Sequence, residues 1–140
     1  MKYAELKSKQ RKEFNEFPIG FAFSKKQLDE SLAELGATKE EVIGVGAGGF
    51  IRKTDKKAFI DLAERHDNEM EGAMQDDDFL MDAIEYELAN HEFCITYDPG
   101  PALSALGLSL KDERVESLYQ KARKSYFEGQ RKLEEESCKQ

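Results

Sequence analysis

Residues 66–110 contain eleven acidic residues and neither lysine nor arginine, and this one-signed stretch limits what the chain can fold into. Apolar residues at helical spacing predict two helices here, so their wet faces carry carboxylates without local cations. Like charges at close spacing destabilise a helix by about a few tenths of a kcal/mol per pair. These eleven negative charges exceed the net charge of the whole chain, which is −8. All of the excess negative charge therefore lies in this segment.

The rest of the chain alternates short helical and strand patterns, which is typical of an α+β fold. Strands are predicted for residues 17–23, 42–45, 50–53 and 93–97. Large and small residues alternate over 17–23, so the small face would let a helix approach closely. The last helix is predicted to bury Val115, Leu118, Tyr119, Ala122 and Tyr126. We expect a single α+β domain over residues 1–135 and a frayed tail over 136–140. In it, a small antiparallel sheet of three or four strands packs against several helices, including an acidic helical hairpin.

Composition excludes several classes of protein. No stretch of 18 apolar residues is present, so we expect no membrane span, and the charged N-terminus lacks the apolar run of a signal peptide. Two isolated cysteines make neither a disulfide framework nor a zinc pattern, which favours a cytoplasmic protein. Negative charge argues against direct nucleic-acid binding, including an alternative in which residues 106–109 and the last helix contact DNA. The sequence does not indicate an oligomeric state.

Two motifs that suggest chemistry have simpler interpretations. The glycine run at 46–49 is followed by a strand pattern, whereas a phosphate loop must open a helix, so a hairpin or bulge is favoured. Cys94 has no nearby basic group to lower its pKa, and we expect it to be a small packed residue in a strand. With no nucleophile–base pair or complete metal set, the sequence predicts a protein that is not an enzyme and needs no cofactor.

The two histidines, His66 and His91, lie on the apolar stripes of the two acidic helices. Glu69 follows His66 by three residues and Glu87 precedes His91 by four. A divalent metal held by both histidines and these carboxylates is therefore an alternative function. The pattern lacks the paired Glu-x-x-His of carboxylate-bridged sites, and a helix dipole alone explains His91. We expect both side chains to be partly buried and bonded to protein groups.

Seven carboxylates of the acidic helices form the candidate partner-binding site: Asp67, Glu69, Glu71, Asp82, Glu85, Glu87 and Glu92. Two interpretations remain open for them. One is a solvated surface, and the other is a negative face that docks on a basic partner protein.

Three stretches resemble an uncharacterised family of small proteins carried by phages and mobile elements of intestinal bacteria. They are residues 1–7 (MKYAELK), 48–55 (GGFIRKTD) and 86–92 (YELANHE). The resemblance implies an accessory factor that acts on host machinery, which includes defence nucleases. We therefore expect an interaction protein whose acidic face binds a basic site on a host protein, such as a nucleic-acid-handling or defence protein that it would inhibit.

Overall fold

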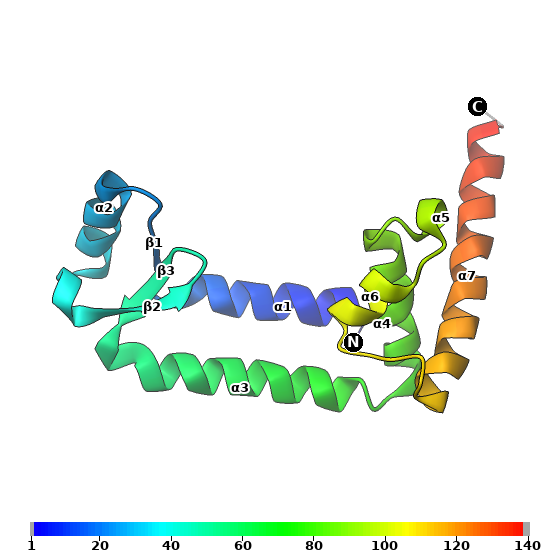
Figure 1. Ribbon diagram of the computed structural model, residues 1–140, viewed down its shortest axis with the longest axis horizontal. Helices are drawn as coiled ribbons and strands as arrows, with labels where there is room; N and C mark the ends of the chain where they lie inside the picture. Colours follow the sequence, from blue (N-terminus) through cyan, green and yellow to red (C-terminus); the bar gives the residue numbers. More distant parts are fainter. Residues whose placement is uncertain (1, 139–140) are drawn as a thin grey trace. The chain divides into compact units, whose positions relative to one another are not determined.

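The computed structural model describes residues 2–138, which form seven α-helices and one three-stranded antiparallel sheet (Figure 1). These residues divide into two compact units. Unit 1 comprises residues 2–7 and 70–138, and unit 2 comprises residues 8–69. Helices α1 (Tyr3–Glu16) and α3 (Lys56–Ala73) each pass from one unit into the other. The predicted α+β class is confirmed, whereas the single domain over residues 1–135 stays a prediction.

Unit 2 contains the whole sheet, in the order β1-β3-β2. The strands are β1 (Gly20–Phe21), β2 (Val42–Gly46) and β3 (Gly49–Arg52). The glycine run forms the hairpin between β2 and β3, as predicted. Ala47 and Gly48 have φ angles of 52° and 76°, and both signs match the primed two-residue turns that suit a hairpin. The ladder is irregular between Gly44 and Gly46, just before the glycine run.

Helix α2 (Lys25–Leu35) packs against β1, and the small residue Gly20 allows this approach. A Cβ atom at Gly20 would lie 2.5 Å from the Phe50 ring and 3.2 Å from Leu35. Strand β1 is shorter than the predicted 17–23. Pro18 has no N–H to donate to the ladder before Gly20, and Ser24 caps α2 shortly after Phe21. Short 3₁₀ turns, η1 (Lys39–Glu41) and η2 (Lys53–Asp55), flank the hairpin.

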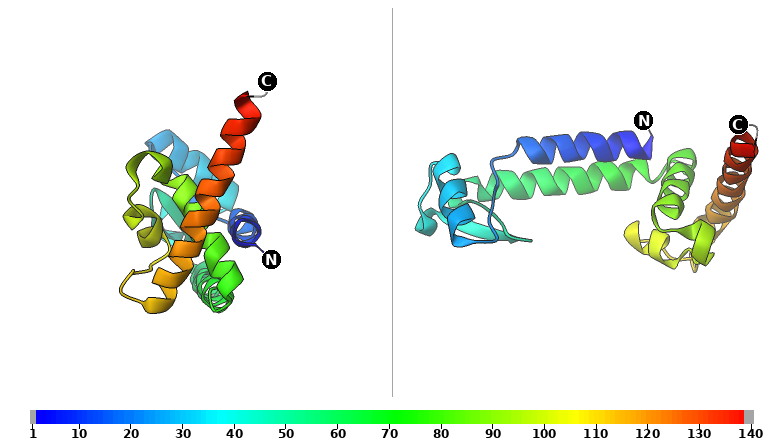
Figure 2. Two further views of the ribbon diagram at one scale, coloured as in Figure 1. Left: turned by 90° about the vertical axis from the view of Figure 1, so that its right-hand side faces the viewer. Right: turned by 90° about the horizontal axis from the view of Figure 1, so that it is seen from above.

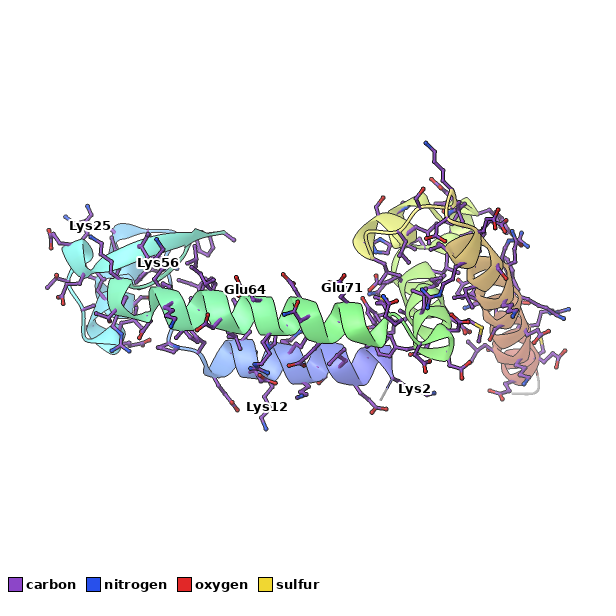
Figure 3. All side chains as sticks on the ribbon, turned by 90° about the horizontal axis from the view of Figure 1, so that it is seen from below. Lys2, Lys12, Lys25, Lys56, Glu64 and Glu71 are labelled. Atoms are coloured by element: carbon purple, nitrogen blue, oxygen red, sulfur yellow. The ribbon has the colours of Figure 1, made fainter. Side chains whose placement is uncertain are left out.

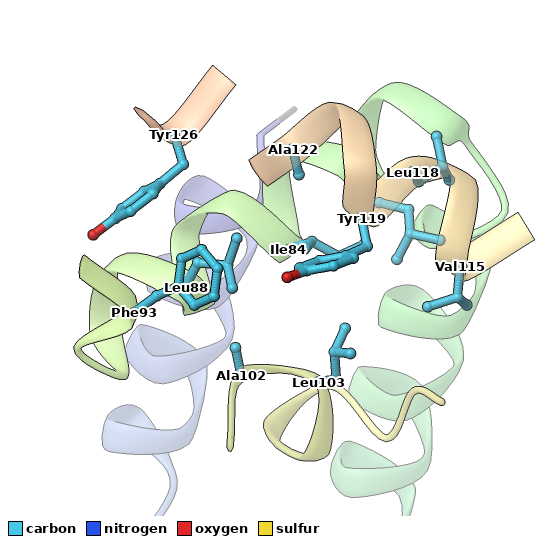
Figure 4. Close-up of a cluster of buried hydrophobic side chains, with 11 residues drawn as sticks. Ile84, Leu88, Phe93, Ala102, Leu103, Val115, Leu118, Tyr119, Ala122 and Tyr126 are labelled. Carbon is cyan, nitrogen blue, oxygen red and sulfur yellow. The ribbon is translucent and has the colours of Figure 1, made fainter. Parts of the chain in front are cut away.

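Unit 1 is built around α4 (Asp77–Asn90), with α6 (Gly100–Ala105) and α7 (Glu113–Cys138) against its apolar face. Asp76 caps α4 by accepting a hydrogen bond from the Phe79 N–H at 3.0 Å. Figure 4 shows side chains of all three helices meeting in one core. All five residues predicted for the buried face of the last helix are buried: Val115, Leu118, Tyr119, Ala122 and Tyr126.

The predicted fourth strand over residues 93–97 is wrong, because this segment forms a one-turn helix, α5 (Phe93–Thr96). Phe93 and Tyr97 are four residues apart, so their rings lie on the same side of the turn, 6.2 Å apart. Ile95 points away and is 72% exposed. The prediction of a packed cysteine is also wrong, since Cys94 is exposed. Alternation over five residues does not distinguish a strand from a turn of helix.

Helix α7 continues to Cys138, so residues 136–138 of the predicted tail are helical. Residues 139–140 of that tail lie outside the described residues. Among the helices of the described chain, none combines the length and apolar composition that a bilayer crossing requires.

Candidate partner-binding site

The seven candidate carboxylates fall into two groups that the sequence did not separate. Two of them contact cations and are neutralised within the protein. The other five have no lysine or arginine nitrogen within 4.0 Å among the described residues: Asp67, Glu71, Asp82, Glu85 and Glu92.

Glu87 belongs to the first group and does not project from the surface, because it is only 3% exposed. The Tyr3 hydroxyl donates a hydrogen bond to Glu87 Oε1 at 2.7 Å, and Lys7 Nζ lies 3.3 Å from the same oxygen. His91 Nε2 lies 3.1 Å from Glu87 Oε2. A partner protein cannot reach this carboxylate, so its assignment to the docking surface is wrong. The sequence missed these contacts because Tyr3 and Lys7 are about 80 residues away in the chain.

Burial alone would raise the pKa of Glu87, but its bonds outweigh burial. The hydrogen bond from Tyr3, the positive charge and hydrogen bond of Lys7, and the hydrogen bond from His91 favour the carboxylate, so its pKa is lowered. The Tyr3 hydroxyl has the opposite shift. Burial and then the hydrogen bond to the Glu87 carboxylate raise the pKa of Tyr3 well above its ordinary value of 10.0.

These shifts predict a pH dependence of stability. The lowered pKa of Glu87 adds stability above its ordinary pKa of 4.5, and this is lost as the pH falls through the lowered pKa. The raised pKa of Tyr3 adds stability below pH 10.0, and this is lost as the pH rises through the raised pKa. Urea unfolding at a series of pH values should show a shallower decline above pH 10.0 for Tyr3→Phe than for the wild type. Identical alkaline declines would contradict the prediction.

Glu69 is also neutralised, on the part of α3 that belongs to unit 2. Arg65 Nη1 donates to Glu69 Oε1 at 2.8 Å, and Lys9 Nζ of α1 lies 3.7 Å from Oε2. Lys9 and Glu69 thus form an ion pair, but 3.7 Å is too long for a hydrogen bond. The buried Oε2 of Glu69 therefore has no hydrogen-bond donor among the described residues. The expectation that Glu69 lacks an intramolecular cation is therefore wrong. The spacing of Arg65 and Glu69, four residues apart on one helix, is a signal that could have shown this.

Within unit 2, α1 and α3 run alongside each other (Figure 2). Arg65 also pairs with Glu13 of α1, and the hydrogen bond from its guanidinium lowers the pKa of that carboxyl. Lys12 of α1 and Glu64 of α3 point outward from this pair of helices (Figure 3). Basic residues of α1 thus form ion pairs with carboxylates of the acidic helices. Counting the charged residues within 66–110 alone does not reveal these pairs.

Both histidines are partly buried and bonded to carboxylates, as expected. His66 Nε2 lies 3.3 Å from Glu13 Oε2, and His91 Nε2 lies 3.1 Å from Glu87 Oε2. The two histidines belong to different units. Within residues 2–138, no three or more His, Cys, Asp or Glu side chains are grouped as metal ligands would be.

Two of the remaining carboxylates, Asp82 and Glu85, are half-buried, and the donors that they bond among residues 2–138 are neutral. Asp82 Oδ2 accepts from the Tyr3 backbone N–H at 2.9 Å. Glu85 Oε1 accepts from the Ser125 hydroxyl at 3.1 Å. These bonds hold both side chains in place without cancelling their charge.

Asp82 and Glu85 line a groove of about 450 Å³ between α4 and α7, which we call the α4–α7 groove. Its α4 wall also contains Tyr86 and Ala89. The α7 wall contains Tyr126, Gly129, Gln130 and Leu133. The groove combines two carboxylates with a mostly apolar lining and contains no basic residue, histidine or cysteine. Sequence reasoning missed it because nothing in the sequence showed that α4 lies beside the second half of α7.

Residues 2–125 match DUF7659, a family of unknown function. The chain belongs to this family. The matched residues include the Tyr3–Glu87 contact and the α4 wall of the groove, whereas the α7 wall, residues 126–133, follows the last matched residue of the DUF7659 region. No curated protein matches the chain, and no solved structure matches it.

Proposed function

We propose that this member of DUF7659 is a non-enzymatic interaction protein that binds a basic segment of a partner protein through unit 1. The observation that carries the proposal is the contrast between its carboxylates. Glu69 and Glu87 contact cations of the chain, whereas Asp82 and Glu85 are fixed in place and keep their charge beside an apolar groove. Unpaired charges beside apolar surface favour a partner of opposite charge.

Further parts of the proposal rest on the sequence. The resemblance to proteins of phages and mobile elements supports an accessory factor that acts on a host protein. The two free cysteines support action in the cytoplasm. The mostly apolar lining of the groove supports a binding role. No observation favours a metal site shared by His66 and His91, and we do not propose one.

The test is to capture partners from a bacterial host lysate, identify them by mass spectrometry and measure their affinity for variants of the chain. Asp82→Asn combined with Glu85→Gln keeps both hydrogen-bond acceptors but removes both charges. We expect this variant to bind an identified partner about tenfold or more weakly, which corresponds to about 1.4 kcal/mol. Its melting temperature should stay within a few degrees of the wild type.

Asp67→Asn is the matched control, because Asp67 is exposed, has no lysine or arginine nitrogen of the described chain within 4.0 Å and belongs to unit 2. It removes one charge without touching the groove, and partner affinity should be unchanged. If the captured partner binds the Asp82→Asn/Glu85→Gln variant as tightly as the wild type, the acidic residues of unit 1 are only a solvated surface.

A further inference from the structure

The geometry of the α4–α7 groove points to the kind of segment that it binds. Resting on the function proposed above, we propose that this groove binds one amphipathic basic helix of a partner protein. Arginine or lysine side chains of that helix would pair with Asp82 and Glu85. Its apolar side chains would lie in the groove between Tyr86 and Leu133.

The dimensions of the groove fit a short helix. Its lining residues on α4 run from Asp82 to Ala89, and those on α7 run from Tyr126 to Leu133. Each wall is therefore about 10 Å long, because an α-helix rises about 1.5 Å per residue. Two parallel rows of side chains at helical spacing form a trough that accepts the apolar face of a third helix.

The α7 wall of the groove has no side chain at one position, Gly129. Gly129 lies in the helix interior, where glycine is less stable than alanine. An added Cβ would meet no atom within 4 Å, so no packing contact requires glycine there. Small residues on both walls, Gly129 and Ala89, leave room for an incoming side chain.

Two apolar residues at the rim remain exposed in the free chain, Leu133 at 59% and Tyr86 at 38%. An apolar contact there would remove surface from water, and the carboxylates would then select a basic partner over a neutral one. Among the described residues the lining includes no basic residue, and Lys7, whose Nζ lies 5.5 Å from the centre of the Tyr86 ring, is paired with Glu87. The charge and the apolar surface of the groove therefore both favour one kind of segment. It is an amphipathic helix with large aliphatic side chains on one face and arginine or lysine beside them.

The probe for the test is a fluorescein-labelled amphipathic helical peptide with leucine on one face and arginine on its flanks. The control peptide has glutamate in place of arginine. Fluorescence anisotropy with the full chain should show binding of the arginine peptide at least tenfold tighter than the glutamate peptide. Binding should weaken as salt is added, because the contacts are charged.

Two variants separate the groove from the rest of the acidic surface. A Cβ at position 129 meets no atom within 4 Å, and Gly129→Leu would extend an apolar side chain from this open position. Because leucine also replaces glycine in a helix, the melting temperature should not fall, while peptide affinity should drop about tenfold. Glu71→Gln with Glu92→Gln removes two exposed charges of unit 1 that do not line the groove, and should leave affinity unchanged.

The outcomes distinguish this inference from the proposed function. If Gly129→Leu binds the arginine peptide as well as the wild type, while neutralising Glu71 and Glu92 weakens binding, the acidic surface binds partners but the groove does not. If the chain does not prefer the arginine peptide to the glutamate peptide, both proposals fail. If sedimentation shows a dimer that Gly129→Leu dissociates, the occupant is a second copy and the inference is wrong.

Discussion

Replacing Phe93 by alanine is expected to lower the free energy of unfolding by about 3–5 kcal/mol, since the change leaves a large cavity in the core of unit 1. Phe93 is 1% exposed. Its ring contacts the rings of four aromatic residues: Tyr97, Tyr119, Tyr126 and Phe127. Urea unfolding of the purified variant measures the loss.

Ile95→Ala is the matched control, because Ile95 lies two residues away on the same helical turn but is 72% exposed. Its effect should stay within about 0.5 kcal/mol. A strand over residues 93–97 would bury Phe93 and Ile95 on one face and make the two losses similar. Equal losses would therefore contradict the α5 turn.

Glu87→Ala is expected to lower the free energy of unfolding by about 3 kcal/mol, because it leaves the buried Tyr3 hydroxyl without an acceptor and Lys7 without its anion. Glu87→Gln should lower it less, since an amide oxygen still accepts from Tyr3. Chemical denaturation of each variant at neutral pH measures both effects.

A double-mutant cycle isolates the hydrogen bond itself. Tyr3→Phe removes the donor, Glu87→Ala removes the acceptor, and the double variant removes both. We expect a coupling free energy of about 1.5–3 kcal/mol, typical of a hydrogen bond to a charged group. Strictly additive effects would show that the start of α1 is not fixed to α4 by this contact.

The sequence predicted the features that depend on local pattern. The buried face of α7 repeats at helical spacing over several turns, and such a signal is strong. The hairpin at Gly46–Gly49 followed from glycines placed between two strand patterns. Residues 93–97 were misassigned because five residues are too few to separate a period of 2 from a period of 3.6. The strand was also assigned without identifying a partner strand with which it would pair.

The candidate site was predicted only in part, since its electrostatics depend on residues far apart in the chain. Lys7 and Glu87 are 80 residues apart, so a local count of charges found an unpaired carboxylate where the fold forms a partly buried ion pair. Asp82 and Glu85 keep their negative charge because their hydrogen-bond donors are neutral. Gly129 and Leu133 became site residues only when the fold placed α7 against α4.

The salt dependence of partner binding shows whether Asp82 and Glu85 contact the partner. For a partner identified by capture, the dissociation constant of the wild type and of the Asp82→Asn/Glu85→Gln variant would be measured at a series of sodium chloride concentrations. The affinity of the wild type should fall steeply as the salt concentration rises. The variant should bind more weakly at low salt, and its affinity should change clearly less with salt. Parallel dependences for the two proteins would contradict this prediction, because binding would then not involve these carboxylates.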